Sequence, residues 1–439
     1  MRGEHRIDVA EAARLVQPDS GRINRRIFGD ERVHELELER IFARCWLFVG
    51  HESQIPRAGD FVTTYMGEDP VIVARDTRGA IGVFLNNCTH KGRTVCQLDR
   101  GNTKSFTCPY HGWTYRTDGT LSGVPYTREA YYGEIDKDAL GLKHAAQVES
   151  YRGLIFATWD PSAPSLVDYL GDMAWYLDIA LDRTEAGTQL IGPPQKFRVH
   201  ANWKTGAENF ISDFQHAQTI AHASALKALQ GNDFRAAVTD GVQANPAPGH
   251  GLFMFRANDD PRTRGNVEFM TLNTPGAPNR LGELRGTGQI DPIAGTVFPN
   301  LSFNFMPGIP NLRMWMPKGP HEMEVWTWGI VDAGLPDAVK TQMYRSFQFM
   351  FGVGGVVEQD DGDQWQEVSE ASRGWIGRNE WSHIGMGLGR EFRDPELPGE
   401  LGLLISESNA RAFYRRWRDL LLTDDWADLP ASTNRVPQS

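Results

Sequence analysis

The chain has 439 residues, of which 40% are hydrophobic and 23% charged, the composition of an ordinary soluble protein with room for two or three domains. Its net charge is −11, from 45 basic and 56 acidic residues, and no basic run forms a stripe, which argues against nucleic acid or an anionic membrane as the partner. No signal peptide, membrane-spanning apolar run or disulfide framework is recognisable, so we expect a cytoplasmic protein.

The first two stretches of the chain differ in predicted secondary structure. Residues 30–45 predict a helix, because Asp30 can cap its start and apolar residues recur near helical spacing. From 46 to 157 the sequence turns to short apolar or alternating runs separated by Gly, Pro and Asp, which predicts strands. The clearest of these predicted strands are 60–65, 70–74, 80–85 and 153–159. A hairpin is expected around the turn at Asp118-Gly119.

From residue 158 onward, helical and strand patterns mix, which makes the chain an α+β protein. Helices are predicted near 165–182, 203–228, 336–351 and 406–422. Strands are predicted near 265–271, 296–306 and 321–332. In the last helix, Ser406 or Ser408 is the expected cap. Its expected apolar side consists of Phe413, Trp417, Leu420 and Leu421.

Two signatures in the β-rich stretch offer two thiolates and two imidazoles. They are Cys88-Thr-His90 and Cys108-Pro-Tyr-His111. This mixed set suits an iron–sulfur cluster in which one iron keeps cysteine ligands and the other takes histidines. Neutral histidines lower the negative charge of the cluster and raise its reduction potential above that of an all-cysteine ferredoxin. The signatures therefore predict a site that accepts single electrons.

Structural zinc is the alternative for these four residues. Zinc sites usually draw on a cysteine pair and a histidine pair, whereas each signature here is mixed, so the spacing favours the cluster. The other two cysteines, Cys45 and Cys96, have no partner pattern and are expected to be small buried residues.

A second group of metal-binding side chains comprises Asp213, His216 and His222. Asp213 and His216 are three residues apart, so on a helix they share a face, whereas His222 would point about 120° away. The two histidines can bind one metal only if the helix breaks or unwinds between them. A lone helical histidine is more often a plain polar or core residue, but a nearby carboxylate supports a metal site, because ligating histidines need oriented partners.

Carboxylates recur in the run 356–363, which contains Glu358, Asp360 and Asp361. Two histidines and one carboxylate on one side of a metal leave open positions, as in non-heme Fe(II) oxygenases. A solvated loop is the other interpretation of this run. The preceding segment 352–355 lacks a full G-x-G-x-x-G and lies beside acidic residues that would repel phosphate, so no nucleotide site is predicted. NAD(P)H would then be oxidised by another protein.

With these motifs the chain resembles the large (α) subunits of Rieske-type aromatic ring-hydroxylating dioxygenases. The resemblance extends from Leu36-Glu-Leu-Glu-Arg-Ile-Phe to Asn409-Ala-Arg-Ala-Phe-Tyr-Arg-Arg-Trp. The motif Cys-x-His-x17-Cys-x2-His is highly specific, and Asn202-Trp-Lys followed by Glu-Asn and Asp-x2-His-x5-His is nearly as specific. The segments that look closest to the biphenyl, phenylpropionate and naphthalene dioxygenase branch are 65–70, 168–172 and 358–361.

The resemblance implies a fold, a domain order and two cofactors. The implied parts are an N-terminal helical segment (1–45) packing on the catalytic domain, an all-β Rieske [2Fe–2S] domain (46–157), and a catalytic domain with a mononuclear Fe(II) (158–439). The catalytic domain would have an antiparallel sheet flanked by helices. Cys88 and Cys108 would bind one iron of the cluster, and His90 and His111 the other.

The resemblance also implies roles around the mononuclear iron. His216, His222 and Asp361 would be its ligands, with Asp360 as the rival carboxylate. Asp213 would be a catalytic bridge between the cluster of one subunit and the iron of its neighbour, because a carboxylate can hydrogen-bond two imidazoles at once.

Asn209 would also lie near the iron. The expected assembly is a trimer, usually with a small β subunit (α3β3).

The implied activity is that of a terminal oxygenase in aromatic hydrocarbon catabolism. A ferredoxin, a reductase or both would supply electrons, and both atoms of O2 would add to an aromatic hydrocarbon or aromatic carboxylate to give a cis-dihydrodiol. The alternative is that the same metal centres hydroxylate the ring once or demethylate an aromatic acid oxidatively. A pure electron carrier or a zinc-stabilised binding protein would leave the long C-terminal part and its metal constellation unexplained.

The substrate pocket is expected to be apolar, as small-molecule sites generally are. Its candidate walls are the residues that flank the proposed ligands, namely Phe210, Phe214, Ala217, Phe351 and Val357. Each of them is otherwise a plain core residue.

Overall fold

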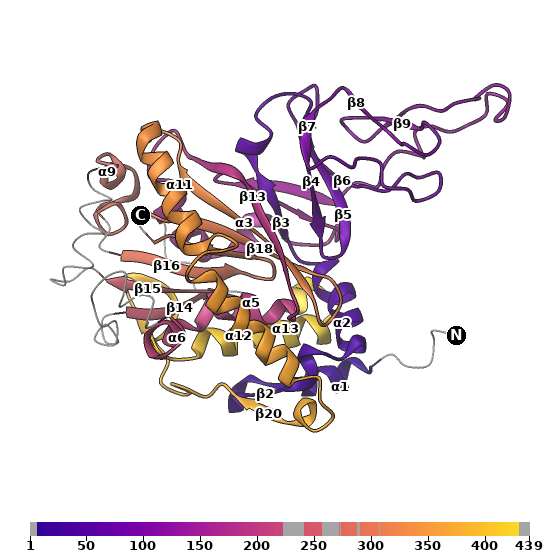
Figure 1. Ribbon diagram of the computed structural model, residues 1–439. Coiled ribbons are helices and arrows are strands. Elements are labelled where there is room, and N and C mark those ends of the chain that lie inside the picture. The colour runs from indigo at the N-terminus through magenta and orange to yellow at the C-terminus, as the bar shows by residue number, and fades with distance from the viewer. Residues whose placement is uncertain are drawn as a thin grey trace. The chain divides into compact units, whose positions relative to one another are not determined.

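The computed structural model describes residues 7–222, 241–256, 272, 274–287, 290–306 and 308–429. It divides into two compact units (Figure 1). Unit 1 comprises Met1–Ile41 and Val167–Ser439, and unit 2 comprises Phe42–Leu166. Unit 2 is built around β-sheets and unit 1 around helices and one large sheet, which confirms the expected α+β class. In the part of the chain described, no helix is both long and apolar enough to cross a bilayer.

Unit 2 contains three small antiparallel sheets. In sheet order, their strands are β11 (Gln147–Tyr151), β12 (Leu154–Thr158) and β3 (Leu47–His51); β6 (Ile81–Leu85), β5 (Asp69–Arg75), β4 (Asp60–Met66) and β7 (Arg100–Asn102); and β10 (Leu121–Gly123), β9 (Thr114–Arg116) and β8 (Ser105–Thr107). The predicted strands in this stretch correspond to β4, β5, β6 and β12, and the predicted hairpin is formed by β9 and β10.

The core of unit 2 takes in both cysteines of the predicted cluster. Cys88 and Cys108 are 3% and 2% exposed and pack among aromatic and aliphatic side chains. Cys45 is buried as expected, whereas Cys96 is only partly buried, so that prediction is half right.

Unit 1 is organised on one nine-stranded sheet in which every neighbouring pair is antiparallel, as predicted. In sheet order, the strands are β13 (Thr188–Val199), β19 (Met323–Asp332), β18 (Asn311–Pro317), β17 (Leu301–Asn304), β16 (Ile290–Val297), β15 (His250–Arg256), β14 (Gly241–Ala247), β22 (Leu397–Leu403) and β21 (Phe392–Asp394). The strand predicted near 321–332 is β19. The one predicted at 296–306 is instead the end of β16 and all of β17, with a turn between them. The strand predicted near 265–271 lies outside the described residues.

Helices accompany this sheet, and several of them pack on it. They are α3 (Leu166–Leu170), α4 (Met173–Leu181), α5 (Trp203–Ser212), α6 (Phe214–Thr219), α9 (Ala277–Leu281), α10 (Glu283–Gly286), α11 (Asp337–Phe351), α12 (Glu358–Ala371) and α13 (Ser408–Leu422). Helix α5 packs on β15 to β18, α13 packs on α5 and β15, and α11 packs on β19 (Figure 1). Helix α12 packs on α5 and begins within the acidic run, so this run is not the loop that we considered above.

The N-terminal segment is helical in short pieces, with two short strands between them. Its elements are α1 (Val9–Arg14), β1 (Val16–Gln17), a 3-10 turn (Pro18–Ser20), β2 (Arg22–Asn24), a second 3-10 turn (Arg25–Phe28), α2 (Glu31–Glu37) and a π-helical turn (Leu38–Phe42), and β2 also pairs with β20 (Trp381–His383). Asp30 caps α2 as predicted, since its Oδ1 accepts a hydrogen bond from the backbone N–H of Arg32 at 3.0 Å. The helical stretch ends at Phe42, three residues before the predicted end.

A buried ion pair joins this segment to the helix that carries the candidate site. Nζ of Lys204 on α5 lies 2.6 Å from Oε1 of Glu37 on α2, and both side chains are fully buried. The indole N–H groups of Trp203 and Trp417 donate to the same carboxylate at 2.9 and 2.7 Å. The Trp-Lys pair of the Asn-Trp-Lys motif therefore fixes the position of α5 against α2 and α13.

The predicted cap of α13 is wrong. The helix begins at Ser408, Glu407 precedes it, and no side chain caps it. The Ser408 hydroxyl donates instead to Oε1 of Gln243 at 3.2 Å, and the Ser406 hydroxyl lies 3.1 Å from that of Ser408. The predicted apolar side of the helix is confirmed, because its four residues are all buried.

Candidate metal centres

The two Cys–His signatures fold as matching loops. In each loop the cysteine N–H donates to the carbonyl five residues on, and the glycine four residues on donates back to the cysteine carbonyl. The four bonds are Cys88 N to Arg93 O (2.8 Å), Gly92 N to Cys88 O (2.8 Å), Cys108 N to Trp113 O (2.7 Å) and Gly112 N to Cys108 O (3.1 Å). Both glycines have left-handed backbones, with φ of 71° and 73°, which glycine adopts at little cost. The loops therefore present their cysteines in equivalent positions.

The two histidines of these loops lie side by side. The ring centroids of His90 and His111 are 4.5 Å apart, and His90 stacks on Trp113 at 5.0 Å. The buried Nδ1 of His90 has no hydrogen-bond partner. Desolvation and the nearby His90 lower the pKa of His111, which favours the neutral imidazole that binds metal. Two buried thiols and two adjacent imidazoles, one with an unpartnered nitrogen, fit a mixed-ligand [2Fe–2S] cluster.

Tyr115 braces the first loop. Its hydroxyl lies 3.2 Å from Sγ of Cys88 and accepts a hydrogen bond from the Thr89 N–H at 3.1 Å. Burial, and then the neighbouring Cys88, raise the pKa of Tyr115 to about 12. The phenol therefore stays protonated and can donate to the cysteine sulfur.

The second constellation begins where α5 ends. Asp213 lies between α5 and α6 with φ −95° and ψ 61°, and its Oδ1 caps α6 by accepting from the His216 N–H at 3.4 Å. Asp213 and His216 therefore do not share a helical face, which corrects that expectation: the backbone breaks at Asp213. The predicted break between the histidines is confirmed, since α6 ends at Thr219 and His222 follows it.

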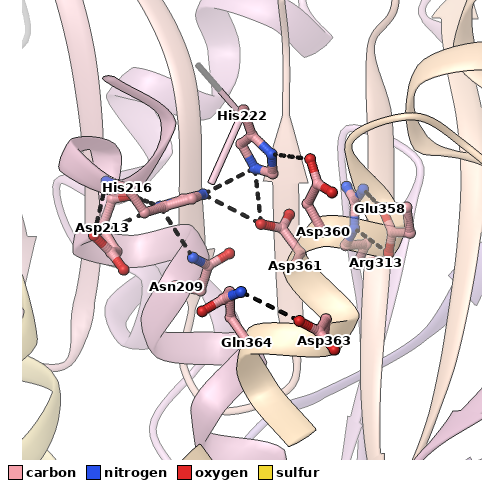
Figure 2. Close-up of polar contacts among 10 residues, drawn as sticks. All are labelled: Asn209, Asp213, His216, His222, Arg313, Glu358, Asp360, Asp361, Asp363 and Gln364. Atoms are coloured by element: carbon pink, nitrogen blue, oxygen red, sulfur yellow. Dashed lines mark hydrogen bonds and ion pairs between the residues drawn. The ribbon is translucent and has the colours of Figure 1, made fainter. Parts of the chain in front are cut away.

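His216, His222 and Asp361 meet at one point (Figure 2). Nε2 of His216 lies 3.0 Å from Nε2 of His222, and Oδ1 of Asp361 lies 3.2 and 2.9 Å from these two atoms. Ligand atoms about 2.1 Å from a metal and at right angles are about 3.0 Å apart, whereas tetrahedral ligands are about 3.4 Å apart. The triangle fits three ligands on one face of an octahedral metal, the arrangement of a 2-His-1-carboxylate iron site.

Asp360 is placed differently from Asp361. Its Oδ2 lies 3.2 Å from Nδ1 of His222, the ring nitrogen that faces away from the triangle (Figure 2). Its side chain is 40% exposed, against 4% for Asp361. Asp360 can therefore accept a hydrogen bond from the Nδ1–H of His222, which leaves Nε2 of that ring free to bind a metal. Asp360 thus lies where a residue that orients a metal ligand would lie, and not where a ligand would.

Without a metal these groups form an ion pair. Burial alone would lower the pKa of His216, but hydrogen bonds to Asp213 and Asp361 raise it to about 10. Burial alone would raise the pKa of Asp361, but hydrogen bonds to His216 and His222 lower it to about 2. A metal that binds there must displace the imidazolium proton, so metal binding is expected to release a proton.

Asn209 and Asp213, which the resemblance places near the iron, both adjoin His216. Nδ2 of Asn209 lies 3.3 Å from Nδ1 of His216. The same ring nitrogen contacts the backbone carbonyl of Asp213 and lies 3.5 Å from its Oδ1. Contacts with the Asn209 side chain and with the carbonyl and carboxylate of Asp213 thus orient the His216 ring with Nε2 toward the triangle.

A cavity of about 760 Å³, open solvent at its mouth included, borders the triangle. The five predicted wall residues, Phe210, Phe214, Ala217, Phe351 and Val357, all line it. The sequence analysis did not single out its other described lining residues, Phe253, Phe255, Ala294, Asn304, Met306 and Met350. A signal existed for two of these, because Phe253 and Phe255 are two apart on β15 and so face the same side.

Two family models match the chain and together cover most of it. The Rieske [2Fe-2S] domain matches residues 45–151, and the ring hydroxylating alpha subunit (catalytic domain) matches residues 167–423.

Full-length relatives agree with these matches. The biphenyl 2,3-dioxygenase subunit alpha of Rhodococcus jostii (strain RHA1) is 43% identical over 98% of this chain and 95% of its own length. The benzene 1,2-dioxygenase subunit alpha of Pseudomonas putida (strain F1) is 41% identical over 97% and 96%. The crystal structure of naphthalene 1,2-dioxygenase from Rhodococcus sp. bound to indole superposes with a TM-score of 0.87 at 37% identity, over 94% of this chain and 97% of that one.

These matches agree with the two donor sets described above. A chain with both domains is an oxidoreductase that carries one [2Fe–2S] cluster and one mononuclear iron. The chain belongs to the family of Rieske-type aromatic ring-hydroxylating dioxygenase alpha subunits.

Proposed function

We propose that this chain is the large subunit of a terminal oxygenase that cis-dihydroxylates a neutral aromatic ring. The observation that carries the proposal is that three candidate iron ligands, which meet at one point in Figure 2, border one apolar cavity. Iron bound by His216, His222 and Asp361 would supply O2 activation there. The protein's own part is to bind the ring beside these ligands, orient it and exclude water.

The character of the cavity favours an uncharged substrate. Aromatic rings of Phe210, Phe214 and Phe351 offer faces and edges on which a ring can pack. Among the described lining residues there is no lysine or arginine, while Asp213 and Asp361 contribute negative charge. An aromatic carboxylate would lose its hydration there without gaining a counter-charge, so an aromatic hydrocarbon is the favoured class.

The geometry of the two Cys–His loops supports an assignment of the cluster ligands. We assign Cys88 and Cys108 to one iron of the cluster, and His90 and His111 to the other. Residues 46–157 would form the cluster domain, and residues 1–45 would pack on the catalytic domain formed by 158–439. These bounds lie close to those of the two compact units.

Asp213 is the proposed route for electrons. Its side chain is 39% exposed although it adjoins His216, so the carboxylate can accept a second hydrogen bond from outside. The proposed donor is a cluster imidazole, His90 or His111, of another copy of the chain. This bridge requires an oligomer, for which we propose a trimer, with a β subunit in an α3β3 assembly.

Electrons would reach the cluster from a ferredoxin, a reductase or both, with NAD(P)H as their source. None of the four cysteines forms a disulfide, which suits the cytoplasmic location that we propose.

Product analysis tests this function. The purified protein, with β subunit and electron-transfer partners, is incubated with biphenyl, benzene and naphthalene, and separately with 3-phenylpropionate, salicylate and phthalate. We expect cis-dihydrodiols from the hydrocarbons and little turnover of the carboxylates. Phenols as the direct product, or turnover of the carboxylates alone, would contradict the proposal.

A further inference from the structure

Arg313 on β18 and Glu358 in the first turn of α12 form an ion pair that is closed to solvent. Their side chains are 0% and 1% exposed. Nε of Arg313 lies 3.4 Å from Oε1 of Glu358, and Nη2 donates to Oε2. The remaining donor group, Nη1, bonds Oδ1 of Asn311 on the same strand. The guanidinium is thus held from two sides beside the metal triangle (Figure 2).

Helix α12 carries one metal ligand but has no cap of its own. Val357 precedes the helix and makes no side-chain capping bond. Glu358 lies three residues before Asp361, so the two side chains project from the same turn. The ion pair therefore ties the ligand-bearing turn to β18, an interior strand of the nine-stranded sheet.

The same guanidinium faces two walls of the cavity. Cζ of Arg313 lies 4.2 Å from the ring centroid of Phe210 and 5.0 Å from that of Phe351. Phe210 belongs to α5 and Phe351 ends α11. A planar guanidinium packs well on aromatic faces. One buried side chain thus contacts α5, α11 and α12, three of the helices that contribute to the cavity wall, although it does not line the cavity itself.

Stability does not account for such a pair, because apolar side chains of similar volume usually stabilise a core at least as well as a buried ion pair. We propose instead that Arg313 and Glu358 are positioning residues. The pair holds Asp361 at its distance from the two histidines and holds the rings of Phe210 and Phe351 against the bound substrate. It thereby sets both the metal affinity of the triangle and the choice of ring carbons that are oxidised. This inference rests on the proposed function.

Three variants of the full-length protein test it. Arg313→Lys keeps the charge but loses the flat, two-pronged guanidinium, and Glu358→Gln keeps the shape but loses the charge. The double variant Arg313→Met with Glu358→Leu replaces the pair by apolar side chains. For each variant, cobalt(II) is titrated into iron-depleted protein, Tm is recorded, and the ratio of dihydrodiol isomers from an unsymmetrical two-ring hydrocarbon is measured.

We expect the single variants to lose roughly 10- to 100-fold in metal affinity and to shift the isomer ratio. The single variants should also have a lower Tm. The double variant should regain the Tm of the unaltered protein but keep the lowered metal affinity and the shifted isomer ratio, because apolar packing restores stability without restoring the positions of Asp361, Phe210 and Phe351. A double variant with the metal affinity and isomer ratio of the unaltered protein would overturn the inference. The double variant tests the positioning role even if a single variant fails to fold.

A control is the partly buried pair of Arg411 and Glu391, whose Nη2 and Oε1 atoms lie 2.5 Å apart and whose side chains are 2% and 20% exposed. Arg411→Lys should lower Tm while leaving cobalt affinity and isomer ratio unchanged. The unaltered protein separates the two hypotheses. If it binds no cobalt at the triangle, the proposed function fails; if it binds cobalt and the variants bind equally well, only the positioning role fails.

Discussion

Oδ1 of Asp361 lies 2.9 Å from Nε2 of His222, although 139 residues separate them in the sequence. The neighbouring Asp360 meets the same imidazole from its other nitrogen, at 3.2 Å. One ring thus has a carboxylate at each nitrogen. From this geometry we propose that Asp361 binds the metal and that Asp360 fixes the tautomer of His222.

Metal analysis of two variants tests this assignment. Asp361→Ala should lose the mononuclear iron and retain about two irons and two acid-labile sulfides per chain, against about three irons in the unaltered protein. Asp360→Ala should keep the third iron with an affinity lowered roughly 10- to 100-fold. Full iron in Asp361→Ala together with a lost third iron in Asp360→Ala would reverse the two roles.

His216→Ala separates the two metal centres. The substitution removes one corner of the triangle but lies outside the loops of the cluster. We expect the visible absorption of the cluster to persist while product formation falls below detection. Loss of the cluster spectrum would show instead that the variant damages the whole protein.

Asp213→Asn tests the electron route. An amide keeps the size of the side chain but not its charge, and we expect both metals to stay largely loaded. In a single turnover with substrate and O2, the reduced cluster of the variant should reoxidise at least 100-fold more slowly, because the hydrogen-bonded bridge is weakened. Reoxidation at the unaltered rate would eliminate Asp213 from the route.

The sequence predicts the ligand residues of both metal centres better than it predicts the strands, helices and cavity walls around them. The Cys–His signatures and the break between His216 and His222 are readable because ligand type and spacing are local properties. The choice between Asp360 and Asp361 is not readable, since it depends on where α12 begins and on how that turn meets β18. The strand order is equally non-local: β14 pairs with β15 but also with β22, which lies far along the chain.

Errors in the predicted elements have local causes. The pattern at 296–306 reads as one strand because both β16 and β17 are apolar and only a short turn divides them. Ser406 and Ser408 at the start of α13 look like caps, yet the Ser408 hydroxyl donates to the buried Gln243 and the Ser406 hydroxyl lies against that of Ser408. Most of the unpredicted cavity wall lies on β15, β16, β17 and the end of α11, which only the tertiary fold brings together.

A partly buried acid next to the proposed electron route should make stability depend on pH. Burial raises the pKa of Glu208 from 4.5 to about 7, although its hydrogen bond with Tyr414 lowers it in part. The native protein then holds a proton that the unfolded chain releases, so this contribution is fully present below pH 4.5 and is lost as pH rises through about 7. Glu208→Gln should remove it, with an effect of at most about 3 kcal/mol.

Denaturant unfolding from pH 4.5 to 8 checks this linkage. Relative to Glu208→Gln, the unaltered protein should lose stability as pH rises through this range. Parallel curves for the two proteins would mean that the pKa of Glu208 is the same in the folded and the unfolded protein.

The central claim is that electrons entering at Cys88, His90, Cys108 and His111 are used to place O2 on an aromatic ring beside His216, His222 and Asp361. It is tested most directly by a single turnover of the reduced protein with naphthalene and O2 labelled with the heavy oxygen isotope. We predict a cis-dihydrodiol in which both hydroxyl oxygens carry the label. A product with one labelled oxygen, or with oxygen from water, would contradict the claim.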